Sequence, residues 1–273
     1  MTDTERRLRA AAFGAHLGVS DAVLADAASA APQLRWLAAV VTGASGHYAR
    51  AAATLEPLLG DGDPVVASLA ASTLASHRRQ LGGHANARTL DAAALRAIVT
   101  ATARPGEADP DGADAAGALA DALLGLAADA LALGHQREAR RLLARVVVEP
   151  SCWRTRVRHG WVSAEVELAA GDAAAARPHA ARAGELAREH GGVRHALKSD
   201  LVLAVAAQDA RLASTVLDEA GQFGLTPLMW PAALLLGRDS TTIVYGVLRR
   251  TDPLGRALAA ASPWVPGVSE MSW

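Results

Sequence analysis

Hydrophobic residues recur every three or four positions through most of the chain, in blocks separated by short turns, and the clearest turn is Gly134-His135. The apolar stripes before and after this turn are Leu119, Leu123, Leu126, Ala130 and Leu133, and then Ala139, Leu142, Leu143, Val146 and Val147. Such spacing places the side chains on one face of a helix. Gly134 suits the positive-φ backbone that ends many helices. The pattern therefore predicts two helices joined by a tight turn.

The same arrangement recurs along the chain, with a small residue five positions after each turn. The turn residues are Gly46, Gly82, Gly134, Gly171 and Gln208, and the small residues are Ala51, Ala87, Ala139, Ala176 and Ala213. The intervals between turns are 36, 52, 37 and 37 residues. The long interval contains an acidic, turn-rich insertion at about 103–114, which we expect to be a mobile surface loop. A fixed period of this length indicates a helical-repeat protein.

Capping residues, prolines and glycines set the expected helix bounds. Two capping helices are expected at 4–18 and 20–30, the second with Ser20 as its N-cap. The repeat helices are expected at 32–42, 47–59, 64–81, 84–102, within 114–148, and at 152–170, 172–190, 193–207, 209–223, 227–236 and 240–250. The tail 262–273 is expected to be non-helical because it holds two prolines and two tryptophans in twelve residues.

The segments Gly46-His-Tyr-Ala-Arg-Ala51 and Gly134-His-Gln-Arg-Glu-Ala139 resemble the turn of the tetratricopeptide repeat (TPR). This resemblance implies an all-α fold, a TPR-like α-solenoid of about five to six antiparallel helix pairs. Residues 1–31 would form a cap, 32–250 the repeats and 251–273 a C-terminal tail. The chain departs from the family in its longer period, its few aromatic positions and Gln208, so the ligand rules of carboxylate-clamp TPR domains do not carry over.

In such a solenoid the first helix of each pair lines a concave wall. Counting from each turn places these residues on that wall: Trp36, His47, Arg50, Arg79, Asn86, His135, Arg158, Trp161, Glu165 and Lys198. Trp and Arg dominate the energetics of many interfaces, and polar groups among alanines favour a groove for a peptide. An alternative for Trp36 and Trp161 is that they fill gaps between Ala-rich helices.

These features favour a non-catalytic scaffold or adaptor that binds a partner protein or peptide in its concave groove, with no cofactor and no metal. The net charge of −1 argues against bulk nucleic-acid affinity. The N-terminus lacks an apolar signal core, and no charge-free apolar run of membrane-spanning length is apparent. We therefore expect a soluble cytoplasmic protein. A single lysine against 26 arginines suggests a GC-rich bacterial genome.

Catalytic and metal motifs are weak. The nine histidines lack ligand spacing, and those after turns are expected to satisfy loose backbone groups. Cys152 beside Trp153 and Arg154 has no identified base partner. The segment VVTGASGHYARA resembles the phosphate loop of short-chain dehydrogenases, but His47 and Ala49 replace two of its glycines and no strand–helix alternation follows. A small-molecule enzyme that uses the groove is kept as a third hypothesis.

Three further interpretations stay open. Residues 5–30 resemble a helix-turn-helix, which would make the chain a transcriptional regulator with a peptide-sensing repeat domain, although the second helix offers no basic residue for base readout. The arginine-rich segment 137–158 binds an acidic partner or, as we favour, pairs with the chain's own acidic insertion. Trp264, Pro266 and Trp273 dock in a groove, as a plug or an arm for homo-oligomers, or pack loosely on the last helix.

Overall fold

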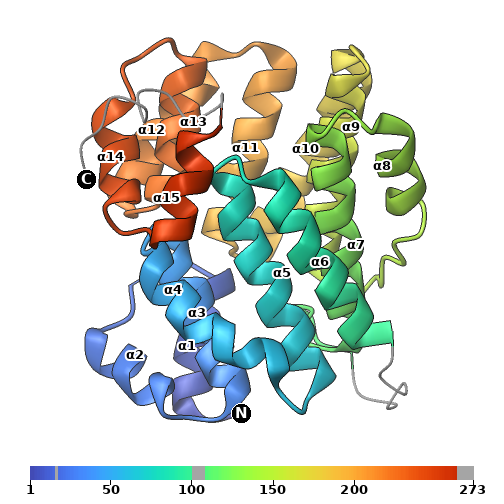
Figure 1. The fold of residues 1–273 in the computed structure, drawn as a ribbon. Helices are drawn as coiled ribbons and strands as arrows, with labels where there is room; N and C mark the ends of the chain where they lie inside the picture. The colour runs from blue at the N-terminus through green and yellow to red at the C-terminus, as the bar shows by residue number, and fades with distance from the viewer. Residues whose placement is uncertain (16–17, 100–107, 263–273) are drawn as a thin grey trace.

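The fold, taken from a computed structural model, is described for residues 1–15, 18–99 and 108–262 (Figure 1). Within these ranges all regular structure is helical. The helices are α1 (Asp3–Phe13), α2 (Asp21–Ala28), α3 (Pro32–Ala44), α4 (Tyr48–Leu55), the 3-10 helix η1 (Glu56–Gly60), α5 (Pro64–Gln80), α6 (His84–Val99), α7 (Ala115–Ala132), α8 (Gln136–Leu143), α9 (Trp153–Ala169), α10 (Ala173–Glu189), α11 (Val193–Ala207), α12 (Ala210–Gln222), α13 (Thr226–Leu235), α14 (Thr241–Leu248) and α15 (Pro253–Ala260).

The turns have the predicted geometry. Gly46, Gly82, Gly134 and Gly171 adopt φ between 78° and 83°, and Gln208 takes the left-handed conformation with φ of 53°. A β-carbon is disfavoured there, which explains the preference for glycine. The alanines five positions later, Ala51, Ala87, Ala139, Ala176 and Ala213, are all fully buried. The expectation that these alanines lie at close contacts between helices is therefore confirmed.

Helices pack both with their neighbours in sequence and with the next helix but one. The first helices α1, α3, α5, α7, α9, α11 and α13, which we call the inner row, contact one another in that order. The even-numbered helices α4, α6, α8, α10, α12 and α14 each pack against the inner-row helix that precedes them. The inner row therefore supplies the side chains that surround the middle of the molecule.

The inner row closes on itself. Helix α1 contacts α11, where Arg194 donates a hydrogen bond to the Ala12 carbonyl at 3.2 Å. The C-terminal helices lie beside α4 and the end of α5 (Figure 1). There Tyr48 and Trp230 belong to one buried apolar cluster, and Arg78 pairs with Asp252 at 2.7 Å. Segments from the two halves of the chain are therefore in direct contact.

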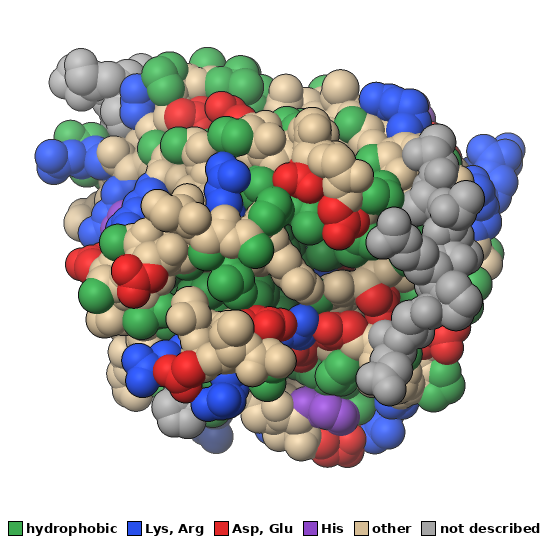
Figure 2. Space-filling model, turned by 90° about the horizontal axis from the view of Figure 1, so that it is seen from below, with side chains coloured by type: hydrophobic (Ala, Val, Ile, Leu, Met, Phe, Trp, Pro, Cys, Tyr) green, Lys and Arg blue, Asp and Glu red, His purple; other side chains and the backbone are tan. Residues whose placement is uncertain are grey.

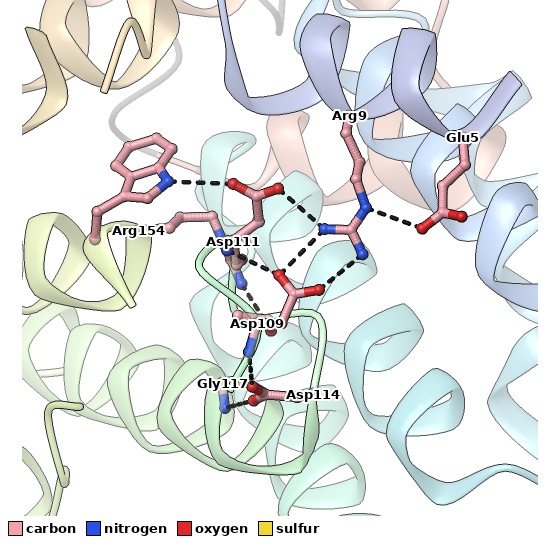
Figure 3. Close-up of polar contacts among 9 residues, drawn as sticks. Glu5, Arg9, Asp109, Asp111, Asp114, Gly117 and Arg154 are labelled. Carbon is pink, nitrogen blue, oxygen red and sulfur yellow. Dashed lines mark hydrogen bonds and ion pairs between the residues drawn. The ribbon is translucent and has the colours of Figure 1, made fainter. Parts of the chain in front are cut away.

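The described half of the acidic insertion, residues 108–114, is non-helical, as expected, and is tied to the helices by ion pairs and hydrogen bonds that the sequence did not predict. Asp109 and Asp111 pair with Arg9 of α1 at 2.8 and 3.0 Å (Figure 3). Asp111 also accepts a hydrogen bond from the Trp153 indole at 3.1 Å, and Asp114 caps α7 by accepting one from the Gly117 backbone at 2.7 Å. Ion pairs with α1, a hydrogen bond from α9 and the cap of α7 therefore hold this segment against three helices. Residues 103–107 lie outside the described part.

Most predicted helices are confirmed, and the exceptions are local. Helix α1 ends at Phe13 rather than at 18, and α8 ends at Leu143, so that the apolar residues up to 148 are not helical. Ser20 caps α2, as predicted, by accepting from the Val23 backbone. Residues 253–260, which we placed in the tail, form α15. Trp264, Pro266 and Trp273 lie outside the described residues.

Helix α7 differs from the other described helices in its length and apolar composition. Helix α7 is the single one in the described chain that is long and apolar enough to cross a membrane, and 67% of that stretch is buried inside the fold. Its contacts with α5, α6, α8 and α9 account for the burial. Helix α7 is accordingly a core helix of the fold.

Candidate functional site: a central cavity

A partly open cavity of about 160 Å³ lies at the middle of the inner row. Every inner-row helix contributes to its wall, and α4 adds one residue. The lining residues are Phe13, Trp36, Val40, Gly43, Ala44, Tyr48, Ser72, Thr73, Ser76, His77, Gln80, Asp121, Arg154, Arg158, Trp161, Arg194, His195, Lys198, Pro227 and Leu228. A concave site of this kind is the usual place for a ligand.

Aromatic rings form one part of the wall. Trp161 stacks on His195 with ring centroids 5.5 Å apart, and Phe13 packs against Trp36 at 6.1 Å. The Trp161 indole donates a hydrogen bond to Ser199 at 2.7 Å. The Trp36 indole likewise donates to Thr73 at 2.9 Å. Since both N–H groups have partners within the protein, these rings offer apolar surface to the cavity rather than hydrogen-bond donors.

Basic side chains form another part of the wall. Arg154 and Arg158, one turn apart on α9, both contact the single carboxylate of Asp121, at 2.7 and 3.0 Å. Lys198 of α11 lies 3.4 Å from Glu165. Arg194, one turn before Lys198, bonds instead to a backbone carbonyl. Among the lining residues, four cations therefore accompany one carboxylate.

Electrostatics at the wall follow from this imbalance. Burial lowers the pKa of Arg194 to about 10, and the neighbouring Arg154 and Arg158 act in the same direction. Burial likewise lowers the pKa of Arg158, with Asp121 opposing that change and Arg154 adding to it. The charged forms of Arg158 and Arg194 are therefore disfavoured, whereas Asp121 raises the pKa of Arg154, and an anion in the cavity would reduce the repulsion between the cations.

Two lining histidines are held neutral. Burial lowers the pKa of His77 to about 3, helped by Arg194, and it lowers the pKa of His195 well below its usual value, helped by Arg194, Arg154 and Arg158. The Nδ1 atoms of both rings are buried and have no hydrogen-bond partner in the described part of the chain. His77 stacks on Tyr48 at 4.8 Å and lies against Gly43, where any β-carbon would clash with its ring.

A second pocket of about 220 Å³ adjoins the cavity and shares Gln80, Lys198 and Leu228 with it. Its wall includes Arg79 and His84. The shared residues lie on α5, α11 and α13, so the two pockets are adjacent at these helices.

Arg79 belongs to a closed charge cluster. It pairs with Asp129 at 2.8 Å and with Asp91, and both carboxylates are fully buried. His84 lies 3.2 Å from Asp129. Gly125 of α7 leaves the space that the Asp91 carboxyl group occupies. Burial raises the pKa of Asp91, with Asp129 adding to the rise and Arg79 opposing it. Two carboxylates thus share one guanidinium.

The residues predicted to form the concave wall divide into two groups. Trp36, Arg158, Trp161 and Lys198 come together around the central cavity, Arg79 lines the adjoining pocket, and Glu165 contacts Lys198. Trp36 is almost fully buried, as the gap-filling alternative requires, whereas Trp161 is only partly buried.

Four predicted residues line neither pocket: His47, Arg50, Asn86 and His135. His47 and His135 lie at the starts of α4 and α8, and Arg50 is exposed on α4, 3.5 Å from Asp21. Asn86 is on α6. All four follow a turn and so stand outside the inner row, which is why the counting rule that suits the first helices does not bring them to the cavity.

Sequence reasoning missed Arg194, His195, Tyr48 and Phe13. Arg194 and Lys198 repeat the i, i+4 spacing of Arg154 and Arg158, and that shared spacing is the signal from which Arg194 could have been found. Phe13 and Tyr48 reach the cavity through contacts between distant segments, and no local pattern encodes those.

The favoured self-pairing of the arginine-rich segment with the acidic insertion holds in part: in the described residues Arg154 contacts the insertion through backbone carbonyls, whereas the insertion's carboxylates at Asp109 and Asp111 pair with Arg9. The Arg154 guanidinium donates to the Asp111 carbonyl (Figure 3). It also pairs with Asp121 of α7, which lies outside the insertion. On the face seen in Figure 2, acidic, basic and hydrophobic side chains are interspersed. Across residues 1–15, 18–99 and 108–262, no three His, Cys, Asp or Glu side chains gather as a metal site would require.

Comparison with known proteins adds no identity: no protein-family model, curated protein or solved structure matches the chain.

Proposed function

We propose that this chain is a TPR-like helical-repeat protein that binds a segment of a partner protein in the central cavity, as a non-catalytic scaffold or adaptor. The observation that carries the proposal is the origin of the wall, since side chains from every inner-row helix converge on one concave site. In repeat proteins, concave surfaces of first helices are the usual binding surfaces.

The chemistry of the wall supports a polypeptide ligand. Trp161 offers a partly exposed ring, and Arg158 and Lys198 offer donors to carboxylate or carbonyl oxygens. The adjoining pocket extends the site along α5, α11 and α13, which suits an elongated segment better than a compact molecule. Tryptophan and arginine together are typical of binding hot spots.

Substitution at the wall tests the proposal. Trp161→Ala and Arg158→Gln should each weaken partner binding by a factor of about 30 or more, since a hot-spot truncation costs about 2 kcal/mol or more. Affinity capture from the native host with the wild-type chain, followed by mass spectrometry, supplies the partner, and titration of that purified partner gives the affinities.

Arg137→Ala is the matched control, because Arg137 is exposed on α8 and lines neither pocket. This variant should bind as the wild type does, and circular dichroism should show the same helical content in all four proteins. Equal affinity of the wall variants and the wild type would remove the cavity as the binding site.

A further inference from the structure

Arg194 differs from the other cations of the cavity wall in its partners. Arg154 and Arg158 reach Asp121, and Lys198 lies near Glu165. For Arg194 the structure gives one hydrogen bond, to the Ala12 carbonyl, and no carboxylate in the described ranges lies within ion-pair distance of its guanidinium. A guanidinium carries five N–H donors in a fork that matches the two oxygens of a carboxylate or phosphate.

The charged neighbours of Arg194 also favour an anion beside its guanidinium. Arg154 and Arg158 are close enough to disfavour its charged form, and their shared carboxylate is already engaged by both. Arg194 is partly buried, and charges that are withdrawn from water are normally paired. Without a ligand, this part of the cavity wall therefore carries more positive than negative charge.

The aromatic residues and the volume of the cavity indicate which apolar group the ligand carries. Phe13, Trp161 and His195 present rings there, and the indole donor of Trp161 is already engaged by Ser199. The cavity volume of about 160 Å³ is close to that of an engineered apolar cavity of about 150 Å³ that holds benzene. The whole cavity therefore has room for a flat apolar group of about one ring.

We propose that the Arg194 end of the central cavity binds an oxyanion, a carboxylate or a phosphate, attached to a flat apolar group of about one ring. Arg194 provides the bidentate contact, Arg158 provides a second positive charge, and Trp161 with His195 packs against the ring. Where the ligand is a side chain or chain end of a partner protein, this inference rests on the proposed function. Where it is a free small molecule, it stands without it.

Isothermal titration calorimetry with small probes tests this chemistry directly. Benzoate and phenyl phosphate represent the two oxyanions, benzamide is the neutral counterpart, and inorganic phosphate lacks the ring. We expect saturable binding of benzoate, phenyl phosphate or both, at least tenfold tighter than that of benzamide and of inorganic phosphate. Absence of saturable binding by both ring oxyanions, or benzamide binding as tightly as they do, would overturn the inference.

Variants locate the binding. Arg194→Gln should weaken binding of the ring oxyanion at least tenfold, and Arg194→Lys should retain part of the affinity because the charge remains. Arg177→Gln is the matched control, because Arg177 also donates to a backbone carbonyl, that of Ala206 at 3.1 Å, but lines neither pocket. Unchanged affinity in Arg194→Gln would overturn the assignment to Arg194. The probe comparison on the wild-type chain decides the chemistry even if that variant does not fold.

These measurements separate the two proposals. Ring oxyanions that bind at Arg194, in a chain whose captured partners bind equally well after substitution of Trp161, support the anion site and contradict the polypeptide site. Loss of partner binding on substitution of Trp161, together with no oxyanion binding, supports the polypeptide site and contradicts the anion site.

Discussion

Two charged regions of this protein use the same side chains in opposite proportions. Around Arg79, one guanidinium serves two fully buried carboxylates, Asp91 and Asp129, with His84 beside them. In the wall of the central cavity, two guanidiniums, those of Arg154 and Arg158, share the carboxylate of Asp121, and the third, that of Arg194, has no carboxylate partner in the described residues. In the first region the guanidinium has carboxylate partners within the chain, although one buried Asp91 oxygen has no hydrogen-bond partner in the described residues. The second region has positive charge left over. Two groups of arginines that look alike in sequence thus differ in whether they need an external partner.

The partners of an arginine within the chain distinguish a structural arginine from one that is available for binding. Arg79 was predicted to lie on a binding wall, and it does border a pocket, yet its hydrogen bonds are spent on Asp91 and Asp129. Arg194 was not predicted, and it faces the cavity with one backbone partner. Position on a concave surface is therefore a weaker guide than the balance of charges around the group.

The largest expected effect comes from removing the cation of the closed cluster. Arg79→Met should lower the free energy of unfolding by about 3–5 kcal/mol at neutral pH, because it leaves Asp91 and Asp129 buried without their partner. Urea denaturation followed by circular dichroism measures this. Adding Asp129→Asn to Arg79→Met should recover part of the loss, since a buried carboxylate that has lost its cation is then removed. A loss below about 1 kcal/mol for the single variant would show that the cluster is not a structural charge pair.

Acid should lower the free energy of unfolding through His77 in the cavity wall. An unfolded histidine titrates near 6.5, whereas folded His77 titrates at about 3. Below pH 6.5 the unfolded chain therefore binds a proton that the folded chain does not, and the free energy of unfolding falls as the pH falls. From His77 alone the expected loss between pH 6.5 and pH 5 is about 2 kcal/mol.

Chemical denaturation at each pH measures that loss. His77→Gln carries no titrating ring and should reduce the slope of unfolding free energy against pH over this window. His135→Gln, at an exposed position on the surface, is the control and should keep the wild-type slope. The same slope in His77→Gln and the wild type would contradict the prediction.

The smallest expected effect is the removal of the unpaired cation. Arg194→Gln loses one hydrogen bond to Ala12, which is typically worth about 1 kcal/mol, and relieves repulsion from Arg154 and Arg158. In the absence of ligand the free energy of unfolding should therefore change by at most about 1 kcal/mol. Thermal and urea unfolding of this variant beside Arg79→Met measure the contrast. A loss as large as that of Arg79→Met would erase the distinction between the two regions.

Local features were predictable from the sequence because their causes are local. The turn at Gly134, the buried Ala139 that follows it and the helix over 193–207 all depend on backbone preference and on spacing within one or two turns. At this level the pattern of small and apolar residues is sufficient. Identifying the repeat as TPR-like is a further step, and it stays a proposal.

Long-range features could not be predicted because their partners are far apart in the chain. Asp109 is fixed by Arg9, 100 residues away, so an acidic and turn-rich segment gave no sign of order. Arg79 finds Asp129 at a separation of 50 residues, and only the fold reveals that the pair is closed. For the cavity, the repeat pattern identified Trp161 and Lys198, but the contact between α1 and α11 that adds Phe13 lies outside any repeat rule.

The contact between α1 and α11, together with the seating of α15 against the end of α5, leaves the array of helices without a free end. An open array can gain or lose whole units and still fold, because each unit touches only its neighbours. Here, deleting one helix pair would pull Arg194 away from Ala12 and Asp252 away from Arg78 at once. The number of helices is thereby fixed, and the protein is expected to unfold as one cooperative body.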